Sequence, residues 1–292
     1  MSRSLILATS IAVALAGAVP VASGAQTMPG ASLPPLSERA PHVEEMLEAL
    51  HLYEVLAIMA SEGIEAARTL EADMFPGEGG AAWSAEAHRI HGEDRMTGLF
   101  EDAFPLDALS EEEVAQVTAF FTAEPGARIA DAEVEARRAF LDPRAEDMAN
   151  AAFRAAIAEG DPRIELLTGF IEANDLVERN VAGALNSNFA FYRGLADGGA
   201  FEVEIPEDLM LSEVWAQEPQ LRRDTIEWLY SFQLSAYDDL SDSDLEAYVA
   251  FSGTEAGQAL NAALFAAFDT MFEQLSHELG DAAAGFIAGE DA

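Results

Sequence analysis

The chain has 292 residues, of which 50% are apolar and 9% aromatic, so it can bury the core of one large or two small domains. Acidic residues outnumber basic ones by 53 to 15, giving a formal net charge of −38. A field this negative repels nucleic acids and anionic lipid headgroups, whereas cations and basic peptides remain permitted partners; a plain solubility surface is the alternative meaning. All basic residues are Arg, and the absence of Cys excludes disulfides, thiolate metal ligands and Cys nucleophiles.

Residues 1–25 have the features of a secretory signal peptide. Arg3 precedes an apolar stretch over 5–19, and the small residues Ser23 and Ala25 stand where cleavage after Ala25 requires them. The apolar stretch is shorter than the about 20 residues that a membrane helix needs, with an uncleaved anchor as the alternative. We therefore expect export to the periplasm and no stable membrane insertion after cleavage.

The rest of the chain is dominated by helical patterns. Residues 26–41 are rich in Pro, Ser and Gly and predict a flexible leader. Beyond it, apolar residues recur at three- and four-residue steps, which is typical of amphipathic helices. The clearest helices are expected over 43–53, 84–104, 145–159, 163–196 (as one long helix) and 219–239, with another beginning at Ser110. One short strand-like alternation at 201–205 cannot make a sheet, so the predicted fold class is all-α.

Two parts of the chain repeat each other. Residues 109–142 align without a gap with 240–273. Residues 47–54 align in the same way with 171–178. Two copies are too few for a solenoid, so we expect a tandem or pseudo-symmetric pair of helical units. The predicted organisation is a signal peptide (1–25), a flexible leader (26–41), helical unit 1 (42–143), a connecting helix (144–162), helical unit 2 (163–280) and a flexible tail (281–292).

Each repeat begins with a capping-box pattern. Ser110 and Glu113 have the required spacing, and Ser241 and Asp244 repeat it with a shorter acid. The acidic stretch 239–246 superficially suggests a calcium loop. It lacks the Gly and the final acid that such a loop needs, and capping already accounts for its Ser and Asp.

A helix–turn–helix corner follows each capped helix. Phe120 and Phe251 are expected to end one helix on its buried side, and Gly126 and Gly257 fall in the first turn of the next. Gly weakens a helix by up to about 1 kcal/mol relative to Ala, so we expect it to serve close approach of a neighbouring helix. A ligand contact at the glycine is the alternative, because anions bind helix N-termini.

The two corners differ in the residue that can cap the second helix. Thr254 can accept a hydrogen bond from a backbone N–H, whereas the aligned Ala123 cannot. We expect the neighbouring Thr122 to substitute for it. The corner residues therefore form a structural repeat motif, which predicts packing rather than reaction chemistry.

The pattern Phe-x-x-Ser/Thr-x-x-Gly, after a capped helix and an export signal, resembles a family of proteobacterial envelope proteins catalogued as domain of unknown function 2059. The residues that carry the resemblance are Phe251, Thr254, Gly257 and Leu260, with Phe120, Gly126 and Ile129 in the first copy. The first copy departs from the pattern at Ala123. The resemblance implies an all-helical periplasmic protein and supplies no catalytic residues.

His88 and His91 are the candidate metal ligands. Two His three residues apart share a helix face and could both bind a metal ion. Zinc sites need three or four ligands, which nearby acids or the remaining His would have to supply. A surface His pair without a metal is the alternative.

Aromatic residues could line a ligand groove between the two units. They are Trp83, Trp215, Trp228 and the stretch 189–192, which contains Phe191 and Tyr192. Aromatic residues at helical spacing more often belong to the core, although binding sites favour the boundary between domains.

The sequence thus predicts an exported, non-enzymatic binding or interaction protein with no cofactor. Its partner would be a protein or a small molecule. The alternative function is a metal-dependent hydrolase that uses His88 and His91. No residues are assigned a catalytic role beyond that pair.

Overall fold

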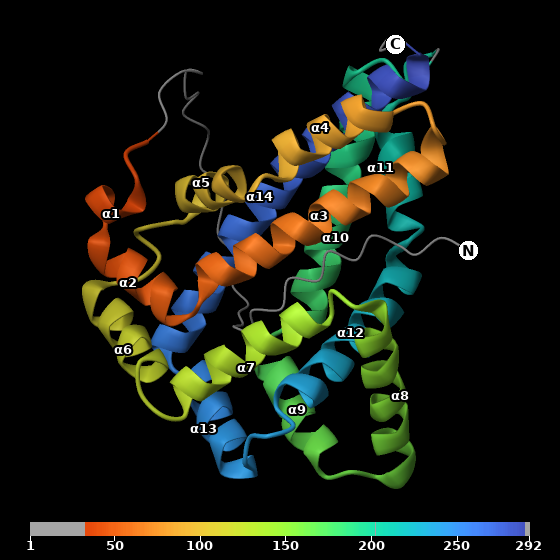
Figure 1. The fold of residues 1–292 in the computed structure, drawn as a ribbon. Coiled ribbons are helices and arrows are strands. Elements are labelled where there is room, and N and C mark those ends of the chain that lie inside the picture. Colours follow the sequence, from red (N-terminus) through yellow and green to blue (C-terminus); the bar gives the residue numbers. More distant parts are fainter. Residues whose placement is uncertain (1–32, 202, 290–292) are drawn as a thin grey trace.

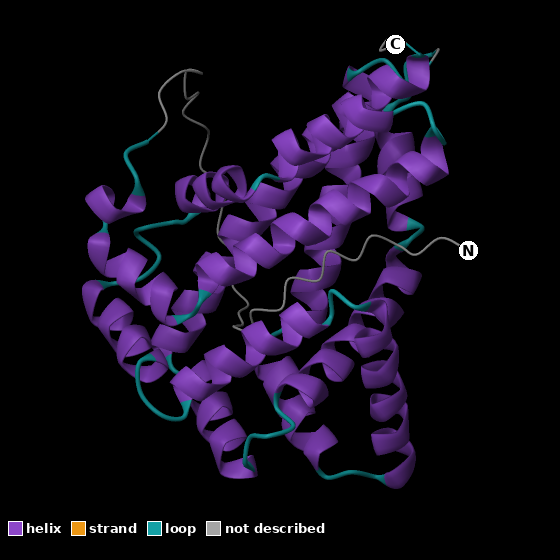
Figure 2. Cartoon of the chain, in the orientation of Figure 1, coloured by secondary structure: helices purple, strands orange, loops and turns teal. Residues whose placement is uncertain are grey.

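The computed structural model describes residues 33–201 and 203–289. Over these residues every regular element is a helix, as Figure 2 shows, which confirms the predicted all-α fold class. The predicted signal peptide and most of the predicted leader lie outside the described residues. In the described part of the chain, no helix is both long and apolar enough to cross a membrane.

In chain order, α8 (Pro143–Glu159) divides the helices into two groups, which follow the sequence repeat (Figure 1). After the short α1 (Leu36–Arg39), the first helical group consists of α2 (Pro41–Ala49), α3 (Leu52–Met74), α4 (Gly80–His91), α5 (Glu93–Ala103), α6 (Glu111–Phe121) and α7 (Gly126–Ala139). Helix α8 connects the groups. The second helical group consists of α9 (Arg163–Ala173), α10 (Leu176–Asp197), α11 (Glu207–Trp215), α12 (Glu218–Ala236), α13 (Asp242–Ser252) and α14 (Glu255–Ala288).

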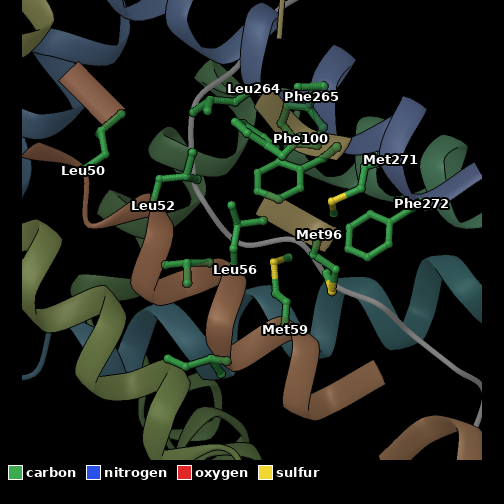
Figure 3. Packing of buried hydrophobic residues seen from close by; sticks show 14 of the residues in the cluster. Leu50, Leu52, Leu56, Met59, Met96, Phe100, Leu264, Phe265, Met271 and Phe272 are labelled. Atoms are coloured by element: carbon green, nitrogen blue, oxygen red, sulfur yellow. The ribbon is translucent and has the colours of Figure 1, made fainter. Parts of the chain in front are cut away.

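Helix α14 is the centre of the core. It contacts α3, α4, α5, α6, α10 and α13, and its buried residues run from Ala256 to Phe286, along nearly the whole length of the helix. Phe100 of α5 packs on Phe268 with the ring centroids 4.8 Å apart. Figure 3 shows Met59, Met96 and Met271 in the same part of the core. Both helical groups therefore contribute to one hydrophobic core.

The two helical groups have the same order of helices and matching contacts. Helix α2 packs on α6 as α9 packs on α13, and α3 packs on α5 as α10 packs on α12. Each group also packs on the last helix of the other, because α5 contacts α14 and α12 contacts α7. His51 (φ 53°) and Asp175 (φ 46°) join α2 to α3 and α9 to α10. In the described part of the chain, they are the only residues other than Gly with positive φ.

Three helices that the sequence predicts as continuous are divided. The prediction over 43–53 is wrong because α2 ends at Ala49 and His51 adopts the left-handed conformation (φ 53°) before α3. The prediction over 84–104 is wrong because Gly92 adopts extended backbone (φ −61°, ψ 140°) between α4 and α5. The prediction over 163–196 is wrong because Asp175 adopts the left-handed conformation between α9 and α10. Asp tolerates that conformation better than most residues, and no Gly or Pro marks the break.

Both ends of the described chain contain helix where flexible segments were expected. Residues 281–288 of the expected tail continue α14, and Phe286 stacks on Phe75 with the ring centroids 5.5 Å apart. In the expected leader, residues 36–39 form α1 and Leu36 is fully buried. Apolar side chains hold both segments on the core, which composition alone does not indicate.

Candidate ligand-binding cavity

A cavity of about 260 Å³ lies between α10, α14 and the end of α3. Its lining residues are Leu70, Met74, Arg179, Asn180, Gly183, Ala184, Ser187, Asn188, Phe191, Tyr192, Leu195, Gln217, Asp269, Phe272, Ser276 and Leu279. Leu70 and Met74 come from the first helical group and the others from the second, so the cavity lies where the groups meet. The volume lies just below the usual range for ligand pockets, about 300–1,000 Å³, and therefore suits only a small molecule.

Two glycines bring the backbones of α10 and α14 into contact beside the cavity. A methyl group on Gly194 would lie 2.0 Å from the carbonyl oxygen of His277. One on Gly280 would lie 2.2 Å from the carbonyl oxygen of Phe191. Only Gly permits so close an approach. The backbone contact therefore fixes the two main walls of the cavity relative to each other.

The cavity holds one arginine that forms no ion pair with any residue that the structure describes. The Arg179 guanidinium lies 5.3 Å from the ring centroid of Phe265, and its buried Nε has no hydrogen-bond partner among residues 33–201 and 203–289. Most arginines of the described residues do pair with carboxylates, as Arg137 does with Glu62 at 2.5 Å. Burial lowers the pKa of Arg179, against the attraction of Asp175 and Asp269. The charge is thus partly desolvated and uncompensated by direct contact.

An aspartate faces the same cavity without a direct partner. Within the described residues, Asp269 forms no hydrogen bond or ion pair. Burial, with a smaller contribution from Glu273, raises the pKa of Asp269 from an ordinary value of 3.8 to about 6, although Arg179 opposes this. A methyl group on Gly183 would lie 2.7 Å from Oδ1 of Asp269, so this glycine makes room for the carboxyl group.

Polar and partly exposed residues form the remaining wall. The Nδ2 of Asn188 donates a hydrogen bond to Oε1 of Gln217 at 3.1 Å, which ties α10 to the start of α12. Met74 at the end of α3 is 38% exposed. Apolar side chains, among them Phe191 and Phe272, supply most of the other surface (Phe272 is labelled in Figure 3).

The aromatic residues selected from the sequence separate into two sets. Phe191 and Tyr192 line the cavity. Trp83 is fully buried, and its Nε1 donates a hydrogen bond to the Ala67 carbonyl oxygen at 2.8 Å, so it belongs to the core. Trp228 stacks on Phe232 at the side of the core, and Trp215 is 59% exposed.

Arg179 and Asp269 were not selected from the sequence, although the alignment of the two groups contains a signal for Arg179. The aligned residue in α3 is Val55, and Leu56 aligns with Asn180. Both apolar residues are buried in the core. Polar residues at positions that are apolar in the other copy could therefore have identified this part of the cavity.

The structure separates the two candidate metal ligands by environment. His88 is exposed, and its Nδ1 lies 2.7 Å from the Ser84 carbonyl oxygen. His91 is 5% exposed and packs on Gly63 of α3. Burial lowers the pKa of His91 to about 4, although the Ala87 carbonyl oxygen opposes this. Across residues 33–201 and 203–289, no group of three or more His, Cys, Asp or Glu could hold a metal ion.

Both predicted capping boxes are confirmed. The hydroxyl of Ser110 accepts a hydrogen bond from the Glu113 N–H at 3.3 Å, and the Glu113 carboxylate accepts one from the Ser110 N–H at 2.7 Å. Ser241 and Asp244 form the same pair of bonds at 3.2 and 3.0 Å. Helices α6 and α13 therefore begin in the same way.

The corner glycines meet the backbone of the helix that precedes them. A methyl group on Gly126 would lie 2.2 Å from the Phe120 carbonyl oxygen, and one on Gly257 would lie 2.3 Å from the Phe251 carbonyl oxygen. The expected close approach therefore occurs within each corner. The Phe120 and Phe251 rings stack on each other, with centroids 4.0 Å apart and planes 8° from parallel. These residues serve packing between the two groups.

The second helices of the two corners are capped differently. The Thr254 hydroxyl accepts a hydrogen bond from the Gly257 N–H at 3.0 Å, as predicted. The expectation that Thr122 takes this role in the first corner is wrong. Its hydroxyl donates to the Thr118 carbonyl oxygen at 2.6 Å, and α7 begins after Pro125 without a side-chain cap.

A buried carboxyl group also joins α7 to the second helical group. The hydroxyls of Tyr237 and Tyr248 donate hydrogen bonds to Oε1 of Glu133 at 2.6 and 3.2 Å. Burial raises the pKa of Glu133 to about 7, although both hydroxyls oppose this. The space beside the two tyrosines is about 10 Å³, which holds no more than about one water. This cluster is therefore an interhelical contact rather than a ligand site.

Comparison of the chain with models of protein families, with curated proteins and with solved structures found no match. The resemblance to the envelope-protein family stays a prediction. Any proposal about function must rest on the geometry of the cavity.

Proposed function

We propose that this chain is an exported protein that binds a small amphipathic molecule in the cavity between α10 and α14. The observation that supports this most is one cavity that combines apolar walls with Arg179 and Asp269, neither of which pairs directly with another residue in the described part of the chain. Ligand pockets typically have apolar walls and a few oriented polar groups. Uncompensated, partly buried charges oppose folding, so a ligand that pairs with them explains their presence.

The proposal also includes two related helical units and export to the periplasm. The shared helix order and the paired Phe120 and Phe251 rings support the two units. The signal-like residues 1–25 support export. A cavity with walls from both groups fits this organisation, because ligand sites favour boundaries between domains.

Titration with benzyl alcohol, followed by amide chemical shifts, tests whether the cavity binds small amphipathic molecules. We expect saturable shifts at residues of α10 and α14 that line the cavity. Ala184→Leu should abolish them, because the larger side chain fills the cavity. Ala182→Leu is the matched control, since Ala182 lies on the exposed side of the same helix.

The two variants separate binding in the cavity from binding elsewhere. Equal shifts in both variants would place the binding outside the cavity. Absence of saturable binding, for this neutral probe and for charged amphiphiles of similar size, would end the proposal.

A further inference from the structure

We infer that the ligand is a small zwitterion with an apolar body, such as a free aliphatic amino acid. Its carboxylate would pair with Arg179 and its ammonium group with Asp269. The inference rests on the proposed function, and specifies the chemistry of the molecule that the cavity takes.

Arg179 supplies the geometry for a carboxylate. Its planar guanidinium can donate two parallel hydrogen bonds, a pattern that matches the two oxygens of a carboxylate. The chain has 53 acidic residues for 15 basic ones, so carboxylates are abundant. Nevertheless none of the described residues brings one within 4.0 Å of Arg179. Its buried Nε still lacks an acceptor, and a carboxylate in the cavity would provide one.

Asp269 supplies the position for an ammonium group. It shares the cavity with Arg179, yet the two side chains form no direct ion pair. Glu273, on the same helix, repels the Asp269 carboxylate, and Leu70 and Met74 of α3 bring no charge. A ligand ammonium would relieve this repulsion. A molecule that carries both a carboxylate and an ammonium group would therefore pair with Arg179 and Asp269 at the same time.

The overall charge favours a zwitterion over a simple anion. The net charge of −38 lowers the concentration of free anions near the protein, whereas a zwitterion carries no net charge. The apolar walls, with Leu70, Phe191 and Phe272, provide for an aliphatic body.

The aligned helix of the first group shows that the fold does not need this arginine. Val55 and Leu56 occupy the positions of Arg179 and Asn180, and they are 3% and 0% exposed. The same place in the fold can thus be filled by ordinary apolar packing. Binding of a ligand carboxylate explains why α10 has Arg179 at this position instead of an apolar residue.

Calorimetric titration of the full chain at pH 7 with three matched probes tests the inference. The probes are leucine, 4-methylpentanoate (which lacks the ammonium) and 3-methylbutylamine (which lacks the carboxylate). We expect leucine to bind about ten- to a hundredfold more tightly than either partial probe, the range for one lost hydrogen-bonded charge. Arg179→Met should weaken leucine and 4-methylpentanoate by a similar factor and leave 3-methylbutylamine unchanged. Asp269→Asn should weaken leucine and the amine and leave the acid unchanged.

The pattern of binding distinguishes failure of this inference from failure of the proposed function. If benzyl alcohol or a partial probe binds in the cavity but leucine binds no better, the zwitterion is overturned and the binding function stands. If no probe binds, both the zwitterion inference and the proposed binding function are overturned. Leucine binding that survives Arg179→Met and Asp269→Asn, but not Ala184→Leu, would also overturn the assignment of the two charged groups.

Discussion

The two helical groups share an arrangement but differ where α3 corresponds to α10 and α7 to α14. In the first group, Val55 and Leu56 of α3 are buried in an apolar core. In the second, Arg179 and Asn180 of α10 face a cavity. Helix α7 has 14 residues and α14 has 34, and Phe272 belongs to the additional length of α14. The cavity thus lies where the groups diverge, whereas the corners lie where they agree.

The largest effect is expected at the corners, where the groups agree. Gly126→Ala and Gly257→Ala should each lower the free energy of unfolding by about 3 kcal/mol, because the new methyl group would clash with a carbonyl oxygen at 2.2 or 2.3 Å. Urea unfolding measures the change. Gly169→Ala is the control, since nothing lies within 4 Å of its added methyl group, and it should raise the free energy of unfolding by up to about 1 kcal/mol. An unchanged free energy of unfolding for either variant would show that the corresponding corner does not need its glycine, and so that the two corners are not equivalent.

A second prediction uses Asp269, whose aligned residue in α7 is the ion-paired Arg138. The pKa of Asp269 is about 6 in the folded protein and its ordinary value is 3.8. Between these values the folded state holds more protons than the unfolded state, so this residue lowers stability as pH rises from about 4 to about 6. Asp269→Asn should remove a decline on the order of 2 kcal/mol, allowing for partial solvent exposure.

Glu133 provides the matched comparison for Asp269. Its pKa is raised from 4.5 to about 7, so its effect has the same sign over a window that extends to higher pH. Glu133→Gln should therefore remove a decline that continues to about pH 7, measured by thermal unfolding across pH. Identical pH profiles for wild type and both variants would contradict the proposed cause, which is burial of the two carboxyl groups.

A third prediction makes α10 resemble α3. Arg179→Val should raise the free energy of unfolding by about 1 kcal/mol, because it removes a partly buried charge without a direct partner. The same variant should lose leucine binding. Arg193→Val is the control on the exposed side of α10, and should change stability by less than about 0.5 kcal/mol. A destabilised Arg179→Val protein would show that the arginine supports the fold.

Local signals in the sequence predicted the features that depend on neighbouring residues. Apolar periodicity predicted an all-α fold, and the spacing of Ser110 and Ser241 from their acidic partners predicted both capping boxes. The break at Asp175 was missed because a left-handed residue other than Gly is held by the packing of α9 and α10. Local patterns contain no information on that packing.

The cavity depends on contacts between distant parts of the chain. Gly194 and Gly280 bring α10 and α14 together, and neither glycine reveals its partner in the sequence. Burial of His91 depends in the same way on Gly63, which leaves room for the imidazole ring. For this reason the sequence favoured the His88–His91 pair and overlooked Arg179 and Asp269. Comparison of aligned positions in the two groups was the available guide to the arginine.

The smallest effect is expected at the caps that distinguish the two corners. Thr254→Ala should lower the free energy of unfolding by about 1 kcal/mol, because the Gly257 N–H loses its acceptor. Ala123→Thr should change it by less than about 0.5 kcal/mol, because α7 begins after Pro125 and a hydroxyl at position 123 does not stand at its cap. Urea unfolding of the two variants measures both changes. A gain of about 1 kcal/mol from Ala123→Thr would mean that the first corner can adopt the capped form of the second, and that the difference between the corners lies in this side chain alone.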